Sequence, residues 1–98
     1  MAFRIVWTDP ALAQLRAILD FIAKDSPTAA LKFAEAIMSR VEVLVTSPFS
    51  GEVYSRARRR SVREILHGSY RIFYRVREND MIIEVLTVWH AARKNPNL

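Results

Sequence analysis

Residues 56–93 constrain the fold more than any other part of the chain, because they contain three consecutive runs rich in β-branched and aromatic residues. Such runs predict β-strands. The third run is apolar on both faces, which indicates a central strand of a sheet. Short segments rich in glycine, asparagine and charged residues separate the runs and predict turns. The predicted strands are residues 62–67, 70–77 and 81–89, with turns at Gly68-Ser69 and Glu78-Asn79-Asp80.

The residues before this segment predict one strand and two helices. Residues 3–7 alternate between two faces, as a short strand does. Thr8-Asp9-Pro10 and Asp25-Ser26-Pro27 each place a capping residue just before a proline, an order typical of a helix start. Apolar residues at helical spacing then predict amphipathic helices at about residues 10–24 and from Pro27 to Thr46 or Ser47. The link between them is short, so we predict an antiparallel helical hairpin.

These elements predict a single α+β domain spanning residues 1–98, in the order β-α-α-β-β-β. The helical hairpin is expected to pack on one face of a small, mostly antiparallel sheet. Residues 52–60 are polar and basic without a clear period, which predicts a loop. Along the strand at residues 70–77, one face would carry Tyr70, Ile72, Tyr74 and Val76, and the other Arg71, Phe73, Arg75 and Arg77. The face away from the helices is therefore predicted to be an arginine surface, to which Arg63 of the neighbouring strand is also assigned.

Composition narrows the class of protein. Hydrophobic residues make up 51% of the chain, enough for a core. There is no cysteine, which excludes disulfides and thiolate metal sites. No apolar run reaches the roughly 20 residues of a membrane helix, and the N-terminal residues lack the pattern of a signal peptide. We therefore predict a cytoplasmic protein with no metal and no cofactor.

The positive charge is concentrated in one segment. The chain carries a net charge of +5, whereas residues 53–77 alone carry +7, from eight arginines and a single acid, Glu64. Such a block favours an acidic partner. Arginine outnumbers lysine, and its planar fork suits carboxylate or phosphate groups.

In this order and at this length, the motifs resemble the ParE/RelE superfamily of type II toxin–antitoxin toxins. The resemblance extends over nearly the whole chain. Its motifs are Trp7-Thr8-Asp9-Pro10-Ala11 with Leu15 and Ile18, Pro27 with Ala29-Ala30, Leu44 with Ser47-Pro48 and Gly51, Arg63-Glu64-Ile65, Tyr70 to Val76, and Ile83 to Val88 with His90 and Arg93.

The resemblance implies a small toxin that a co-expressed antitoxin neutralises with its C-terminal segment, in a hetero-oligomer. We expect that segment to be acidic and partly disordered. Two branches share the fold. ParE-like members poison DNA gyrase and block replication, whereas RelE-like members cut messenger RNA on the ribosome.

Cleavage of RNA requires a base, an acid and cations that stabilise the phosphorane. Arg63, His90 and Arg93 are the candidates for a ribonuclease site. Further groups that could titrate or stabilise charge are His67, Arg71, Arg75, Glu52 and Glu64. The RNA-cleaving branch usually carries a tyrosine near the C-terminus, but residues 91–98 contain no aromatic residue, and arginines are poor bases. This departure favours a gyrase-directed binding toxin, with a ribosome-dependent endoribonuclease and an inactive antitoxin-binding copy as alternatives.

Each candidate residue also has a structural interpretation. His90 can be a hydrogen-bonded histidine at a strand end, Tyr70 and Tyr74 can face the core, and the arginine run can be a solvated loop. Partner binding is assigned to the arginines of the basic segment and to one tryptophan that would anchor a partner if exposed. These residues are Arg56, Arg58, Arg59, Arg60, Arg63, Arg71, Arg75, Arg77 and Trp89.

Overall fold

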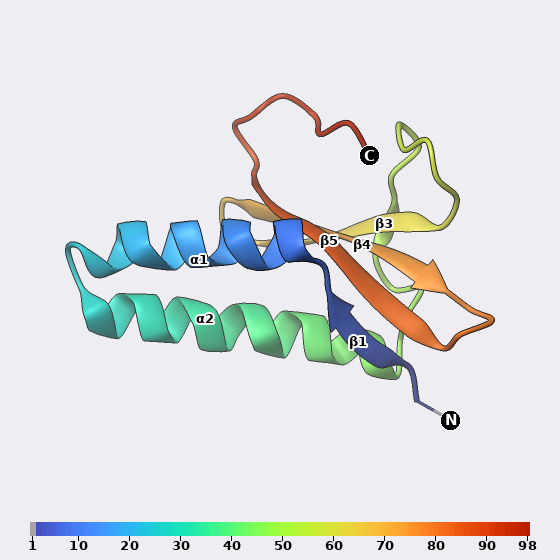
Figure 1. Cartoon of the computed structure of the whole chain (residues 1–98), viewed down its shortest axis with the longest axis horizontal. Coiled ribbons are helices and arrows are strands. Elements are labelled where there is room, and N and C mark those ends of the chain that lie inside the picture. Colours follow the sequence, from blue (N-terminus) through green and yellow to red (C-terminus); the bar gives the residue numbers. More distant parts are fainter. Residues whose placement is uncertain (1) are drawn as a thin grey trace.

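The computed structural model describes residues 2–98 and shows a helical hairpin beside a twisted five-stranded sheet (Figure 1). The predicted α+β class and the order of its main elements are confirmed. The elements are β1 (Arg4–Trp7), α1 (Asp9–Ala23), α2 (Pro27–Glu42), the 3₁₀ turn η1 (Val43–Val45), β2 (Glu52–Val53), β3 (Val62–His67), β4 (Tyr70–Arg77) and β5 (Ile82–His90).

The sheet has the strand order β1-β5-β4-β3-β2. Only the pair β1 and β5 is parallel, and the other neighbours are antiparallel. β5 therefore lies inside the sheet, as its apolar sequence predicts. In β4 and β5, Phe73 pairs with Thr87 but Tyr74 pairs with Val85, so Leu86 is an extra residue that forms a β-bulge.

Both helices begin where the sequence places a cap. The Thr8 hydroxyl accepts a hydrogen bond from the backbone N–H of Ala11, and the Ser26 hydroxyl accepts one from Ala29. A proline follows in the first turn of each helix, where the missing N–H leaves no bond unmade. Neither helix of residues 2–98 is long and apolar enough to cross a bilayer.

The main core lies between the helices and one face of the sheet. Ala11, Leu15, Ile37 and Val41 of the helices pack against buried strand residues of that face. These strand residues are Ile65, Ile72, Tyr74, Val76, Ile83 and Val85. The hairpin therefore covers one face, as predicted.

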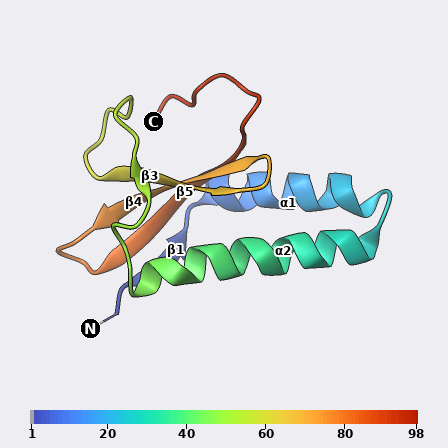
Figure 2. The same ribbon diagram turned by 180° about the vertical axis from the view of Figure 1, so that it is seen from behind.

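The opposite face holds a second, smaller core, which the sequence did not predict. Tyr54, Val62, Phe73 and Leu86 are buried there, and Trp89 and Leu98 pack against them. The segment after β2 and the C-terminal tail both lie on this side, away from the helices (Figures 1 and 2). The expectation of an arginine surface is thus corrected, because these two segments partly cover the face and its apolar centre is buried.

The predicted loop at residues 52–60 is confirmed for residues 54–60 and corrected at its start. Glu52 and Val53 form β2, which pairs with Glu64 and Arg63 of β3. Tyr54, the next residue, is buried in the second core. A two-residue strand is too short to show a period of two, so the sequence pattern could not reveal it.

Tyr74 joins β4 to the turn that follows the helices. Its side chain is fully buried, its hydroxyl donates to the Pro48 carbonyl at 2.9 Å, and it accepts from the Gly51 N–H at 2.9 Å. A Cβ at Gly51 would collide with this hydroxyl, so the close approach requires glycine. Burial raises the pKa of the Tyr74 phenol above its ordinary value of 10.0.

We predict that Tyr74→Phe lowers the free energy of unfolding by about 1–3 kcal/mol, because it leaves a buried donor and a partly buried acceptor unpaired. The phenol's pKa is raised in the folded state. The stability that it contributes is therefore complete below the unfolded pKa of about 10 and is lost as pH rises through the raised value. Urea unfolding across an alkaline pH series measures both effects.

Tyr70→Phe is the matched control. The side chain of Tyr70 is half-buried on the same face, and a phenyl ring retains its edge contact with Phe33. An equal loss of stability in both variants would contradict the role assigned to the Tyr74 hydroxyl.

Candidate protein-binding surface

Arg71 is held in place on the second face of the sheet. Its Nε and Nη2 donate to the two carboxylate oxygens of Glu64 at 2.9 and 3.1 Å, and its Nη1 donates to Asn95 Oδ1 at 2.8 Å. The guanidinium also stacks 4.7 Å from the Phe73 ring centroid. The hydrogen bonds with Glu64 raise the pKa of Arg71 above its ordinary value. All three of its nitrogens donate within the chain, so Arg71 is a structural cation.

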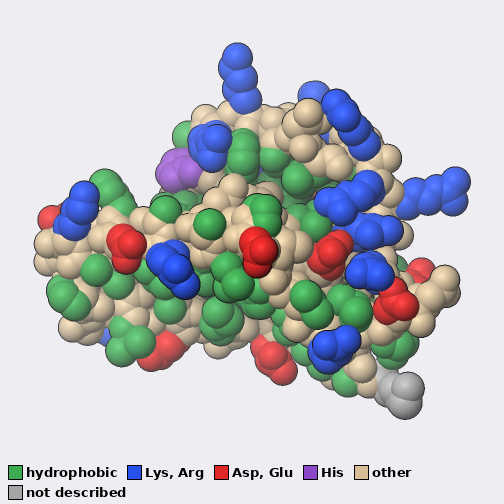
Figure 3. All heavy atoms as spheres, viewed as in Figure 1, with side chains coloured by type: hydrophobic (Ala, Val, Ile, Leu, Met, Phe, Trp, Pro, Cys, Tyr) green, Lys and Arg blue, Asp and Glu red, His purple; other side chains and the backbone are tan. Residues whose placement is uncertain are grey.

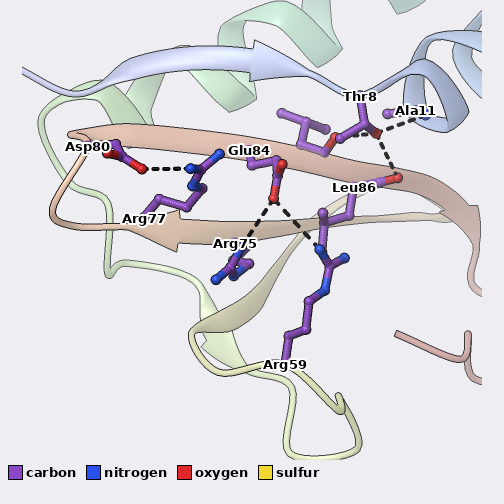
Figure 4. Close-up of polar contacts among 9 residues, drawn as sticks. Thr8, Ala11, Arg59, Arg75, Arg77, Asp80, Glu84 and Leu86 are labelled. Carbon is purple, nitrogen blue, oxygen red and sulfur yellow. Dashed lines mark hydrogen bonds and ion pairs between the residues drawn. The ribbon is translucent and has the colours of Figure 1, made fainter.

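Arg75 and Arg59 converge on Glu84 from two elements (Figure 4). Arg75 Nη1 lies 3.7 Å and Arg59 Nη1 3.9 Å from Glu84 Oε1. Both distances are too long for hydrogen bonds, and Glu84 Oε1 and Arg75 Nε are buried without a hydrogen-bond partner. Glu84 therefore neutralises charge at this point while leaving hydrogen-bonding capacity unused.

The remaining arginines of the basic segment differ in whether an acidic side chain pairs with them. Arg77 is paired with the exposed Asp80 at 2.6 Å. By contrast, Arg56, Arg58 and Arg60 are exposed and form no ion pair with the acids of residues 2–98. Figure 3 shows Lys and Arg side chains gathered beside the strands, while the helices show mixed charges. Within residues 53–77, the exposed arginines without an ion pair therefore lie on the segment between β2 and β3.

Arg63 lies apart from the other strand arginines. It pairs in register with Tyr74, on the face covered by the helices. Its Nη1 donates to the carbonyls of Phe49 and Gly51 at 3.1 and 2.8 Å. The side chain thus holds the turn before β2, and the predicted grouping of Arg63 with Arg71, Arg75 and Arg77 on one sheet surface is corrected. The alternation of side chains along β3 indicates this placement, because Arg63 is two residues from the core residue Ile65 and therefore lies on the same face.

His90 and Arg93 lie at the other end of the sheet. His90 contacts the Tyr70 ring edge-on at 5.1 Å, and its Nδ1 accepts from the Ala92 N–H at 3.1 Å. The Arg93 guanidinium lies 3.7 Å above the ring centroid of Trp89. Trp89 is partly covered, and its indole N–H donates to the Lys94 carbonyl. The Trp89 side chain therefore packs within the surface and does not protrude from it.

His67 stands apart from these groups, with its ring 5.8 Å from that of Phe33. Glu52 is exposed on the edge strand β2. Within residues 2–98, no three His, Asp or Glu side chains come close enough together to hold a metal ion.

Several residues of this surface were not predicted. Two contacts hold the C-terminal tail: Asn95 accepts from Arg71, and the Tyr54 hydroxyl donates to the Pro96 carbonyl at 2.7 Å. Glu84 holds the basic segment to the sheet through its ion pair with Arg59. Glu84 had one detectable signal, since it is the only acid inside an otherwise apolar strand. The others had no local signal, because their partners are distant in the chain.

Residues 5–95 match the family model described as the ParE toxin of type II toxin–antitoxin system, parDE. The chain belongs to this family. The toxin is 36% identical over 97% of its length to the Sinorhizobium fredii protein Y4kP, covering 95% of that protein. It is 33% identical over 92% of its length to Toxin RelE2 of Caulobacter vibrioides, covering 97%. It is thus a type II toxin of the ParE/RelE superfamily.

Solved structures of related systems share the fold of the toxin. A chain of the chromosomal ParDE system from P. aeruginosa superposes with a TM-score of 0.71 at 25% identity, over 90% of the toxin and 95% of that chain. The isolated E. coli RelE toxin superposes with a TM-score of 0.66 at 18% identity, over 96% and 89%. Members named for either branch therefore have this architecture.

We predict that Glu64 and Arg71 are coupled by about 1.5–3 kcal/mol in the free energy of unfolding, because their charged hydrogen bonds are largely shielded from water. A double-mutant cycle with Glu64→Gln and Arg71→Met measures this coupling. The matched control is the cycle Arg77→Met with Asp80→Asn, an exposed pair for which we expect less than about 1 kcal/mol. Similar values in both cycles would contradict the structural role of Arg71.

Proposed function

We propose that this toxin is ParE-like, binding DNA gyrase and blocking replication until its antitoxin neutralises it. The observation that carries the proposal is the separation of the groups that RNA cleavage would need. The likeness to the ParE family model and to the ParDE chain supports the same branch.

Arg63 and His90 are too far apart to act on one phosphate. Arg63 is opposite Tyr74 in β4, whereas His90 is opposite Tyr70, and the two residues lie on strands either side of β4. With about 3.4 Å per residue and about 4.8 Å between strands, they are separated by about 14 Å along the sheet and about 10 Å across it. A general base must lie within about 3 Å of the proton it removes. These two residues therefore do not form one catalytic site.

Arg71 does not replace Arg63 as the cation that a ribonuclease site would need. Its guanidinium donates to Glu64 and Asn95, and releasing it would leave the partly buried Glu64 carboxylate unpaired. The surface thus has charge suited to binding but lacks a converging acid and base.

The alternative is a RelE-like, ribosome-dependent ribonuclease. A hollow of about 220 Å³ beside His90 and Arg93, with Tyr70 in its wall, is the observation that favours this alternative. The relative named Toxin RelE2 adds to it. A site there would use His90, Arg93 and Tyr70, without Arg63.

An antitoxin partner follows from the same comparisons, since two of the similar structures are the RelBE2 complex of Mycobacterium tuberculosis and the intact E. coli RelBE complex. For this toxin, we propose a partner with an acidic segment that contacts Arg56, Arg58 and Arg60. These exposed guanidinium groups attract carboxylates and are more weakly hydrated than the ammonium group of lysine.

We predict that the purified toxin inhibits gyrase supercoiling and accumulates cleaved DNA complexes, while messages in a translation-coupled reaction stay intact. His90→Ala and Arg93→Ala should leave the gyrase inhibition unchanged. Normal supercoiling at saturating toxin would refute the proposal. Cut messages that disappear in the His90→Ala variant would instead establish the ribonuclease.

We further predict that the affinity of the toxin for its acidic antitoxin falls steeply as salt concentration rises, because exposed charges are screened within about 8–10 Å at physiological ionic strength. Arg58→Gln with Arg60→Gln should flatten this dependence. Titration calorimetry at several salt concentrations checks it, with Arg16→Gln and Lys32→Gln, exposed cations of the helices, as the matched control. An affinity that does not change with salt would assign the binding to apolar contacts.

A further inference from the structure

A hollow of about 420 Å³ opens on the second face of the sheet, between the start of α1 and the C-terminal tail. Its walls are mainly apolar. Pro10 comes from the helix, Leu86 and Trp89 from β5, and Pro96 and Leu98 from the tail. The hollow is large enough to receive one bulky aliphatic or aromatic side chain.

Positive charge lies in the wall of this hollow and next to it. Arg59 is part of its lining, has a side chain that is 48% exposed, and has only the 3.9 Å contact with Glu84 as an ion pair. Arg58 and Arg60 extend the charge along the chain. Arg93 does not line this hollow itself, but its guanidinium lies 3.7 Å above the ring centroid of Trp89, which does. An apolar cavity is thus flanked by cations whose charges are unpaired or only loosely paired within residues 2–98.

We infer that this hollow receives an apolar side chain from an acidic peptide segment, with carboxylates on either side of that anchor contacting Arg59 and Arg93. Hot spots of protein interfaces have this composition, with a buried apolar anchor and charged groups around it. The inference rests on the proposed function only for the identity of the partner, which would be the antitoxin.

Charge complementarity favours this occupant over two others. A second copy of the toxin also carries a net charge of +5 and would be repelled. A nucleic acid would satisfy the arginines, but its phosphates have no favourable contact with the walls formed by Pro10, Leu86 and Pro96. A peptide satisfies both parts of the surface at once.

The test uses three fluorescein-labelled peptides of twelve residues each. The first has a central leucine flanked by glutamates and aspartates, the second replaces the leucine with serine, and the third replaces the acids with glutamines. Fluorescence anisotropy with the full-length toxin reports affinity at several salt concentrations. We expect the leucine peptide to bind roughly tenfold or more tightly than the serine peptide, because burying a leucine side chain contributes that much. The glutamine peptide should bind weakly at every salt concentration.

Asn97 offers a variant that blocks the hollow without disturbing the core. It is exposed and lines the hollow, and its side chain makes no hydrogen bond within residues 2–98. Asn97→Trp should reduce binding of the leucine peptide to the level of the serine peptide, while Asn97→Ser should leave it unchanged. Arg59→Gln should weaken both acidic peptides, and Lys32→Gln neither.

Equal binding of the leucine and serine peptides, or equal binding to the Asn97→Trp and Asn97→Ser variants, would overturn the inference. Tighter binding of a twelve-nucleotide oligo-dT, abolished by Asn97→Trp, would also overturn it and would make the hollow a nucleic-acid site. The gyrase assay separates the two claims. If the native toxin fails to inhibit gyrase, the proposed function fails even when the peptides bind as expected. If it inhibits gyrase but ignores the leucine, only the inference fails.

Discussion

The structure depends on one requirement: the backbone of β5 beyond the end of β1 needs hydrogen-bond partners. β1 pairs with β5 only as far as Val85, yet the next residues of β5 are buried and their polar groups require partners. Side chains at the start of α1 provide them. The Thr8 hydroxyl donates to the Val85 carbonyl at 2.8 Å, and Gln14 Oε1 accepts from the Thr87 hydroxyl and from the Val88 N–H. α1 must therefore begin directly after its N-cap Thr8, and this requirement places the whole helical hairpin against one face of the sheet.

The β-bulge at Leu86 lets β5 contribute side chains to the cores on both faces of the sheet. Because Leu86 is an extra residue, β5 directs it into the second core while Val85 stays in the first. The tail then folds over Leu86 and leaves the hollow beside it. The arginines on this face are thus divided between a locked cation, Arg71, and exposed ones on the neighbouring segment. The arginine that stabilises this face is therefore different from those that remain exposed.

Much of the fold was predictable because its signals are local. The caps before Pro10 and Pro27, the periods of the helices and the alternation of β4 each lie within a few residues, and all correspond to observed elements. β2 was missed because two residues carry no period. The prediction for Arg63 was wrong because it followed the charge of the side chain, whereas strand alternation places Arg63 on the same helix-covered face as Ile65. The roles of Glu84 and Asn95 were not predictable, since their partners are distant in sequence.

The sequence by itself determined the elements, their order, the central place of β5 and the excess of positive charge, since these follow from residue types and short-range spacing. Only the tertiary structure decided which arginines are neutralised and which remain free. That division depends on which acids come within a few ångströms of each guanidinium, and on where the tail covers the sheet. Coulomb and hydrogen-bond energies depend on distance in space, and the distance between Arg71 and Asn95, or between Arg59 and Glu84, is set only when the whole chain has folded.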